Sequence, residues 1–316
     1  MHNKTFYTGL FLFLTLAFQT IAKDYSQFAV KSDTMRITVS DGTELFVEVR
    51  GEGIPCLYIH GGPGVGSYWM EKLYGDVLEK HFKMIYLDQR GSGRSASAQN
   101  ENYSPERIAK DFEEIRKALG IEAWVTFSHS FGGLLQMEHA RLYPNTIRGM
   151  MLVESTINLK ESIEGMINYS LDFLDIQGDA RQPYLDKSKD ALDRLIPLFG
   201  KLRERGEFWK IHYGDPQNYE IMDSVMAEVP NPNKEFGRRA LGIGDYYKNY
   251  KPLTAEMTMP VLLYYGKRDY SVGPEHYKDM LFPHAMVRTW EGGHVPFMEG
   301  KKELDNAIAE WIATLD

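Results

Sequence analysis

The fold of this 316-residue chain is decided by the stretch Phe-Ser-His-Ser-Phe-Gly-Gly, residues 127–133. A β-rich run at 123–126 precedes it and a helical pattern follows it. A strand, a sharp turn and a helix form the context in which a nucleophilic serine stands at the tip of a strained turn. So tight a turn needs small residues two positions before and after the nucleophile. Gly132 meets that need on one side, and Ser128 replaces the usual glycine on the other. The stretch predicts Ser130 as a nucleophile, and the alternative is an ordinary Ser/Gly turn.

Strands and helices alternate through most of the chain. Two alternating apolar and polar runs around Asp41-Gly42 predict a β-hairpin, because that dipeptide suits a tight turn. The run 55–59 is continuously apolar, as expected of a parallel strand buried on both faces. Further strands are expected at 83–87, 147–153, 260–265 and 285–290, with helical patterns between most of them. We therefore predict an α/β fold with a mostly parallel central sheet and an antiparallel N-terminal hairpin.

The strand pattern is interrupted between about 156 and 250, where the sequence is helical, polar and aromatic. Prolines are expected to break this region into short pieces (Pro183, Pro197, Pro216, Pro230 and Pro232). Such an insertion after a sheet strand predicts a helical cap. The expected organisation is a signal peptide at 1–22, a first part of the core at 23–155, the cap at 156–255 and a second part of the core at 256–316.

The first residues have the pattern of a secretory signal peptide. Lys4 supplies a positive charge, residues 9–18 are apolar, and Thr20-Ile21-Ala22 offers small residues for cleavage. The apolar run is shorter than the about 20 residues of a membrane span, so an uncleaved anchor ranks second. We expect an exported protein, periplasmic or extracellular, with no stable membrane insertion after cleavage. Cys56 is the single cysteine, which excludes an intrachain disulfide.

The composition bears on which ligands and partners the protein can bind. The net charge of −8 argues against a nucleic-acid partner, because binding phosphates requires clustered Lys and Arg. The sequence contains no metal-ligand cluster, phosphate loop or dinucleotide fingerprint. We therefore expect no cofactor and no metal, and a small-molecule or short-peptide substrate.

Three residues at strand ends predict a catalytic triad. Ser130, Asp269 and His294 each follow a predicted strand, and the carboxyl ends of parallel strands meet at one edge of a sheet. A serine hydroxyl is a weak nucleophile and needs a base within hydrogen-bond reach. His294 is expected to take and return the Ser130 proton, and Asp269 to hold the imidazole in the required tautomer. The alternatives are a turn-capping Asp269 and a solvated loop His294.

The tetrahedral intermediate of such chemistry needs backbone N–H groups directed at its oxyanion. Phe131 follows the nucleophile and is expected to supply one. The glycine-rich loop at 60–64 is expected to supply the other, from Gly62, because glycine allows close approach of the backbone.

Two further motifs carry a family resemblance. The stretches His-Gly-Gly-Pro-Gly at 60–64 and Asp-Gln-Arg-Gly-Ser-Gly-Arg-Ser at 88–95 resemble signatures of the proline iminopeptidase branch of the α/β-hydrolases. The resemblance implies the α/β-hydrolase fold and a cofactor-free serine hydrolase with a helical cap. The family includes aminopeptidases that release N-terminal proline or other residues. Ser130, Asp269 and His294 match the family's triad.

The chain departs from this family at two places that bear on the substrate. Val-Glu-Ser at 153–155 stands where an Arg-Gly pair is usual, and Glu207-Phe208-Trp209 differs in order from the family's Trp-rich stretch ending in Glu. A free α-amine is well held by a partly desolvated carboxylate. Glu154, Glu207 and Trp209 are therefore the candidate substrate-binding residues. The alternative is that acids of the cap are solvated surface.

Three functions remain open from the sequence. The first is an exported serine aminopeptidase of proline iminopeptidase type that acts through an acyl-enzyme. The second is a carboxylesterase or lactonase on the same triad. The third is a binding protein on a hydrolase fold, without turnover.

Overall fold

The computed structural model describes residues 33–315, so the expected signal peptide lies outside the described residues. One eight-stranded sheet has the order β1-β2-β4-β3-β5-β6-β7-β8. The β1–β2 and β2–β4 pairs are antiparallel and all other pairs are parallel, which confirms the predicted sheet with its N-terminal hairpin. The strands are β1 (Asp33–Thr38), β2 (Glu44–Arg50), β3 (Ile54–Ile59), β4 (Phe82–Leu87), β5 (Trp124–Ser130), β6 (Ile147–Ser155), β7 (Val261–Gly266) and β8 (Ala285–Trp290).

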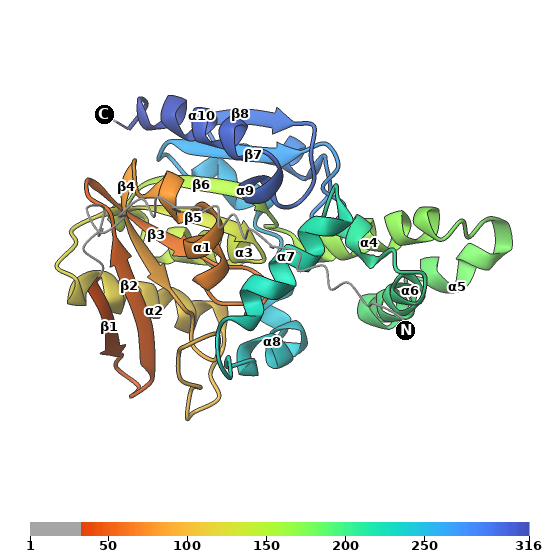
Figure 1. The fold of residues 1–316 in the computed structure, drawn as a ribbon, viewed down its shortest axis with the longest axis horizontal. Helices are drawn as coiled ribbons and strands as arrows, with labels where there is room; N and C mark the ends of the chain where they lie inside the picture. Colours follow the sequence, from red (N-terminus) through yellow and green to blue (C-terminus); the bar gives the residue numbers. More distant parts are fainter. Residues whose placement is uncertain (1–32, 316) are drawn as a thin grey trace, which may run out of the picture. The chain divides into compact units, whose positions relative to one another are not determined.

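Helices cover both faces of the sheet (Figure 1). On one face α2 (Pro105–Ala118) packs against α3 (Gly132–Leu142), and α3 contacts β3, β5 and β6. On the other face α1 (Tyr68–Leu78), α9 (Pro296–Glu299) and α10 (Lys301–Ile312) contact one another, and α10 contacts β7 and β8. The start of α2 follows from its sequence, because the Ser104 side chain accepts the N–H of Arg107 and Pro105 occupies the first turn.

The region between β6 and β7 is helical. It holds α4 (Leu159–Phe173), α5 (Gln182–Leu185), α6 (Ala191–Glu204), α7 (Pro216–Ala227) and α8 (Glu235–Arg239), with 3₁₀ turns that include η4 (Phe208–Ile211) and η6 (Gly244–Tyr247). We call residues 156–255 the cap. The expectation that Pro197 breaks the chain is wrong, since it lies inside α6. Buried Leu195, Leu198 and Leu202 hold that helix together by packing. Between β7 and β8 the helical element is only a 3₁₀ turn, η8 (His276–Asp279).

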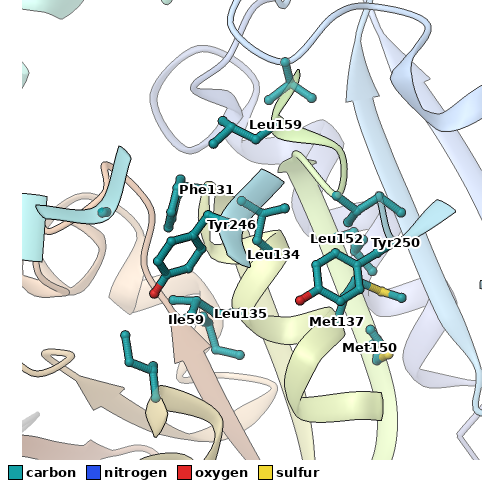
Figure 2. Packing of buried hydrophobic residues seen from close by; sticks show 14 of the residues in the cluster. Ile59, Phe131, Leu134, Leu135, Met137, Met150, Leu152, Leu159, Tyr246 and Tyr250 are labelled. Carbon is teal, nitrogen blue, oxygen red and sulfur yellow. The ribbon is translucent and has the colours of Figure 1, made fainter. Parts of the chain in front are cut away.

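The cap is joined to the core through buried aromatic side chains. Figure 2 shows Tyr246 of η6 beside Phe131, next to the apolar side chains of α3. The ring centroids of Phe131 and Tyr246 are 4.9 Å apart, and the Tyr246 hydroxyl donates to the carbonyl oxygen of Tyr103 at 2.7 Å. The residue that follows Ser130 is therefore packed against the cap.

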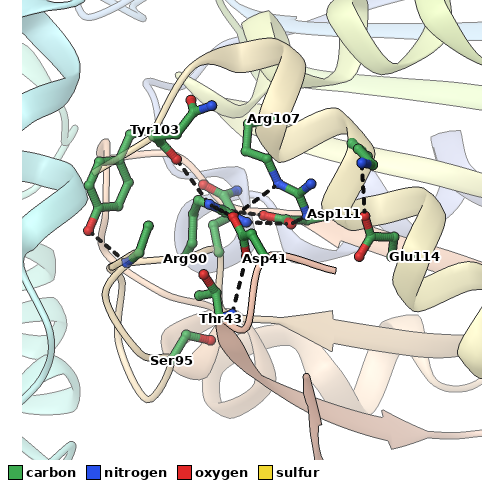
Figure 3. Close-up of polar contacts among 12 residues, drawn as sticks. Asp41, Thr43, Arg90, Ser95, Tyr103, Arg107, Asp111 and Glu114 are labelled. Atoms are coloured by element: carbon green, nitrogen blue, oxygen red, sulfur yellow. Dashed lines mark hydrogen bonds and ion pairs between the residues drawn. The ribbon is translucent and has the colours of Figure 1, made fainter. Parts of the chain in front are cut away.

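A buried guanidinium fixes the loop after β4. Arg90 donates to both carboxylate oxygens of Asp111 at 2.6 and 2.8 Å and to Asp41 at 2.8 Å, as drawn in Figure 3. Its side chain is fully buried. The arrangement ties the β1–β2 turn to α2 and supports the loop that follows β4.

None of the helices within residues 33–315 is both long enough and apolar enough to cross a membrane.

Candidate active site

The turn after β5 has the strained backbone expected of a nucleophile elbow. Ser130 has φ +56°, which is rare for a residue with a side chain. A Cβ on Gly132 would lie 2.2 Å from the carbonyl oxygen of Ile59, so this position accepts only glycine. Ser128 is accommodated because its buried hydroxyl donates to Gln136 Oε1 at 2.5 Å and lies 2.8 Å from Ser155 Oγ. The departure from the usual glycine is thus structurally compensated.

Asp269 and His294 lie together at the carboxyl edge of the sheet. His294 Nδ1 is 2.9 Å from Asp269 Oδ2, and the other Asp269 oxygen accepts the amides of Ser271 and Val272 at 2.9 and 3.0 Å. Burial acts to raise the pKa of the Asp269 carboxyl, but the charge of His294 and these hydrogen bonds hold it below its ordinary value. Asp269 is therefore an ionised, immobilised acceptor for the imidazole Nδ1–H.

Ser130 and His294 line the same cavity of about 230 Å³, together with His129, His212, Trp69 and other side chains. Among the hydrogen bonds of residues 33–315, none joins the serine hydroxyl to the imidazole. Such bonds often tighten only when substrate binds. The structure brings the three predicted residues to one site with only the Asp269–His294 bond formed.

Two backbone amides beside Ser130 are available to a ligand. In the part of the chain that the structure describes, the N–H groups of Gly62 and Phe131 donate to no backbone or side-chain oxygen. Both residues line a second cavity of about 320 Å³ that also contains Ser130. Gly61 holds this loop against the elbow, because a Cβ there would lie 2.6 Å from the carbonyl oxygen of His129. Amides without a protein acceptor beside a serine are the kind of donor that an oxyanion hole uses.

Two further histidines pack against His294. His129 Nε2–H donates to the backbone carbonyl of His294 at 2.9 Å, and the two rings are 4.5 Å apart. His212, from the cap, accepts the His294 N–H on its own backbone carbonyl at 3.1 Å, and its ring nitrogen Nδ1 pairs with the Ser271 hydroxyl. Burial lowers the pKa of His129 well below its ordinary value and that of His212 to about 3, so both are neutral. Sequence reasoning missed His212, because nothing in its surroundings marks it.

The walls of both cavities are mainly apolar. In the 320 Å³ cavity, which we call the larger cavity, α4 and α6 contribute Leu159, Ile163, Met166, Leu195 and Phe199. In the 230 Å³ cavity, which we call the smaller cavity, Trp69, Tyr213, Met222 and Met226 stand around His294. No carboxylate lines either cavity among the described residues. Another hollow, of about 560 Å³ along β8 and α10, contains neither Ser130 nor His294.

The order of the sheet, the elbow and the strand-end residues agree with the comparison to known families. A family model described as the alpha/beta hydrolase fold matches residues 55–301. The chain belongs to the α/β-hydrolase fold family.

Relatives of this hydrolase differ in their named activities. The AB hydrolase superfamily protein YclE of Bacillus subtilis is 24% identical over 283 residues, 86% of this chain and 96% of that protein. Proline iminopeptidase of Neisseria meningitidis is 32% identical over 119 residues, 37% of this chain and 38% of that enzyme. The chain thus aligns with little more than a third of that iminopeptidase.

Solved structures share the fold. A proline iminopeptidase-related protein from Thermus thermophilus superposes with a TM-score of 0.75 at 23% identity, covering 90% of this chain and 98% of that one. An esterase from Exiguobacterium antarcticum superposes with a TM-score of 0.67 at 16% identity, covering 89% of this chain and 100% of the esterase. At these identities the likeness shows the fold alone.

The candidate amine-binding residues of this hydrolase are not at the cavities, and their prediction is corrected. Glu154 is fully buried on the far side of Asp269, where its oxygens accept the Gly266 amide and the Trp290 indole N–H. Glu207 pairs with Lys210 at 2.9 Å, and neither it nor Trp209 lines either cavity. The segment turns at η4 so that the later residues His212 and Tyr213 reach the site instead.

Proposed function

We propose that this α/β-hydrolase is a serine hydrolase that cleaves carboxylic esters through an acyl-enzyme. Ser130 Oγ forms a bond to the substrate carbonyl carbon while its proton passes to His294 Nε2. The bond from carbon to the leaving oxygen then breaks, and that oxygen takes the proton from His294. Water then attacks the acyl carbon while His294 takes its proton, the bond from that carbon to Ser130 Oγ breaks, and Ser130 regains the proton as the carboxylic acid leaves. Asp269 holds His294 with Nδ1–H toward the carboxylate, and the bond of 2.9 Å supports this role.

The amides of Gly62 and Phe131 are the proposed donors to the oxyanion. Both flank Ser130 at the larger cavity and have no protein acceptor among the described residues. Donors fixed by the backbone stabilise the charge that develops on the carbonyl oxygen without reorganising.

The single observation that carries the ester proposal is the chemistry of the two cavities that meet at Ser130. Their walls are mainly apolar, and no carboxylate lines either one within residues 33–315. An apolar wall favours a neutral substrate, since burying a charged amine without a partner is costly. The leaving group must lie near His294, which lines only the smaller cavity. The larger cavity, with Phe131 and without His294, is therefore the proposed acyl site.

A second candidate is an aminopeptidase of proline iminopeptidase type. The observation that favours it is the 32% identity with the Neisseria meningitidis enzyme over 119 residues. It requires a group that accepts hydrogen bonds from the free amine of the substrate. In the described part of the chain the acceptors that line the two cavities are hydroxyls, backbone carbonyls and imidazoles, with no carboxylate, so the ester proposal ranks first.

The deciding experiment measures turnover of three substrates by the purified protein: a p-nitrophenyl ester, a prolyl anilide with a free amine, and the same anilide with a blocked amine. We expect the ester to be hydrolysed and Ser130→Ala to lose that activity by at least about 1,000-fold. Cleavage of the free anilide alone would establish the aminopeptidase instead. Equal activity of Ser130→Ala and wild type would overturn both proposals.

Two methionines provide a matched test of the cavity assignment. Met166 lines the larger cavity and Met222 the smaller one, and both are half-buried. Met166→Trp is expected to lower kcat/KM for octanoyl relative to acetyl esters by about tenfold, the usual scale of apolar discrimination. Met222→Trp should leave that ratio unchanged and instead alter the preference between p-nitrophenyl and 1-naphthyl acetates. The reverse pattern would exchange the two sites.

Export is a separate proposal that rests on the sequence of residues 1–22. Expression of the full chain in a bacterial host followed by fractionation and intact-mass measurement tests it. An exported product that begins near Lys23 is expected, and a full-length cytoplasmic product would contradict it.

A further inference from the structure

We propose that Glu154 is a positioning residue for the triad: as a neutral carboxylic acid it donates its proton to Asp269 and holds that carboxylate toward His294. This inference rests on the proposed function, because it assumes that Asp269 and His294 serve Ser130. Glu154 contacts neither cavity, so it acts through Asp269 and touches no substrate.

The backbone at Glu154 is built to turn its side chain away from the cavities. In the parallel ladder between β5 and β6, His129 pairs with Val153 and Ser130 with Ser155, so Glu154 is an extra, bulged residue. It has φ +46°, an unfavourable conformation for a glutamate. Bulges beside active sites commonly re-aim a side chain. Here the bulge directs the carboxyl toward the loop after β7.

The Glu154 carboxyl is held by two N–H donors beside Asp269. Oε2 accepts the Gly266 amide at 2.9 Å and Oε1 accepts the Trp290 indole N–H at 2.7 Å, while the Asp269 carboxyl is near enough to raise the pKa of the group. The Trp290 ring lies so close to Gly292 that a Cβ on that glycine would be 2.0 Å from a ring carbon. Position 292 therefore requires glycine, because the Trp290 indole that donates to Glu154 occupies the space of a side chain there.

Two buried carboxyls in contact share one proton. Both residues are 0% exposed, and two ionised carboxylates in contact away from water would repel strongly. Asp269 accepts three N–H donors, including the imidazole, whereas Glu154 accepts two. Burial and the negative Asp269 raise the pKa of Glu154 well above its ordinary value, while that of Asp269 is lowered. The shared proton therefore resides on Glu154.

A neutral donor in this position has two effects on the triad. It fixes the Asp269 carboxylate, so that Oδ2 stays in line with His294 Nδ1. It also disperses the negative charge of Asp269, which moderates how strongly the carboxylate holds the imidazolium formed during attack. An ionised glutamate would have the opposite electrostatic effect.

The test compares Glu154→Leu, which removes the donor, with Glu154→Gln, which keeps a neutral donor and loses acceptance of one N–H. The readout is the rate at which a fluorophosphonate labels the protein. This probe reacts with an activated serine and does not require the natural substrate, so its rate measures how well the triad activates Ser130. Glu154→Leu is expected to label about 10- to 100-fold more slowly, the scale of a hydrogen bond to a charged group, because the loss of a fixed Asp269 outweighs its stronger attraction for the imidazolium. Glu154→Gln is expected to label less than about tenfold more slowly. Near-ultraviolet circular dichroism checks that each variant is folded.

A second readout separates positioning from a merely structural role. The labelling rate should decrease toward low pH, and this decrease (the acid limb) should begin at a higher pH in Glu154→Leu. The reason is that Asp269 without its donor attracts the imidazolium more strongly. The far-downfield proton resonance of His294 Nδ1–H should shift in both variants, more in Leu than in Gln. The neighbouring titratable groups have pKa values displaced by burial, histidines downward and tyrosines upward: His129, His212, His276, Tyr169, Tyr264 and Tyr265.

Each outcome bears on one proposal. Wild-type labelling, acid limb and resonance in a folded Glu154→Leu would overturn the inference while leaving the proposed function intact. Labelling of Ser130→Ala at the wild-type rate would instead overturn the proposed function. If Glu154→Leu does not fold, Glu154→Gln decides: an amide is a weaker donor than a carboxylic acid, so an unmoved His294 resonance in that variant contradicts the inference.

Discussion

His129 lies against His294, with ring centroids 4.5 Å apart and its Nε2–H bonded at 2.9 Å to the backbone carbonyl of His294. The two rings have different roles because only His294 has a carboxylate on its Nδ1. His129 supports the loop that carries the proposed base.

From this relationship we predict that His129→Leu lowers the free energy of unfolding by about 1–3 kcal/mol, because it leaves a buried carbonyl without its donor. Its kcat should fall by less than about 100-fold, whereas His294→Ala should lose at least about 1,000-fold. Urea unfolding and initial rates on a p-nitrophenyl ester measure both quantities. A His129→Leu variant as inactive as His294→Ala would make His129 the base instead.

Gly61 sets the distance between the glycine loop and the elbow. A Cβ at this position would lie 2.6 Å from the carbonyl oxygen of His129 and 2.7 Å from Ser130 Cβ. We predict that Gly61→Ala displaces the proposed oxyanion donors and lowers kcat by about 100-fold, the cost of misplacing reacting groups by about 1 Å. Gly200→Ala is the matched control. That position lies within α6 with no atom within 4 Å of the added methyl, so activity should not change and stability should rise by about 0.5–1 kcal/mol.

Buried neutral histidines should make the protein sensitive to acid. Burial lowers the pKa of His60 to about 4 and that of His212 to about 3. Below the ordinary histidine value the unfolded chain binds protons that the folded chain refuses, so stability is full above about pH 6.5 and falls as pH decreases toward 4. Each such histidine contributes up to about 1.4 kcal/mol per pH unit in that window.

Urea unfolding at several pH values between about 7 and 4 tests this acid sensitivity. His212→Gln should reduce the slope of stability against pH. Glu154 acts in the opposite sense, since its raised pKa makes the folded state bind a proton that the unfolded state releases. Stability that does not decrease toward pH 4 in the wild type would contradict the prediction.

Arg90 is expected to be structural. Its removal would leave Asp111, buried beside it, with one fewer cationic partner. We predict that Arg90→Leu lowers the free energy of unfolding by about 3–5 kcal/mol, as is typical when one member of a buried pair is lost. The exposed pair of Arg36 and Glu44 gives the control, because Arg36→Leu should cost no more than about 1 kcal/mol. The guanidinium of Arg107 also donates to Asp111, at 2.6 Å, and a near-neutral Arg90→Leu would show that this contact alone suffices.

The sheet and the reactive edge could be predicted because periodicity constrains both. Parallel strands bring their carboxyl ends to one edge whatever the loops do, and so the sequence alone places Asp269 and His294 together. The strained turn at Ser130 follows from the same local pattern, since the glycine at 132 allows strand and helix to approach.

The walls of the site could not be predicted, because they depend on tertiary packing. Glu154 follows the strand expected at 147–153, much as Asp269 follows the strand expected at 260–265, but it lies at a bulge within β6 that reverses the direction of its side chain, and no periodicity signals a bulge. In the cap, Pro197 is tolerated by the packing of α6, and His212 reaches His294 only because η4 turns there. These contacts depend on residues that are distant in sequence.

The bond between the His294 amide and the carbonyl oxygen of His212 has a mechanical consequence. His212 also pairs with the Ser271 hydroxyl, so a movement that withdraws the segment after η4 from the core would have to break both contacts. Substrate entry by that route would occur with the base loosened, and the base would be fixed again only when the cap returns. Entry of substrate by that route and its reaction would then occur in two different states of the molecule.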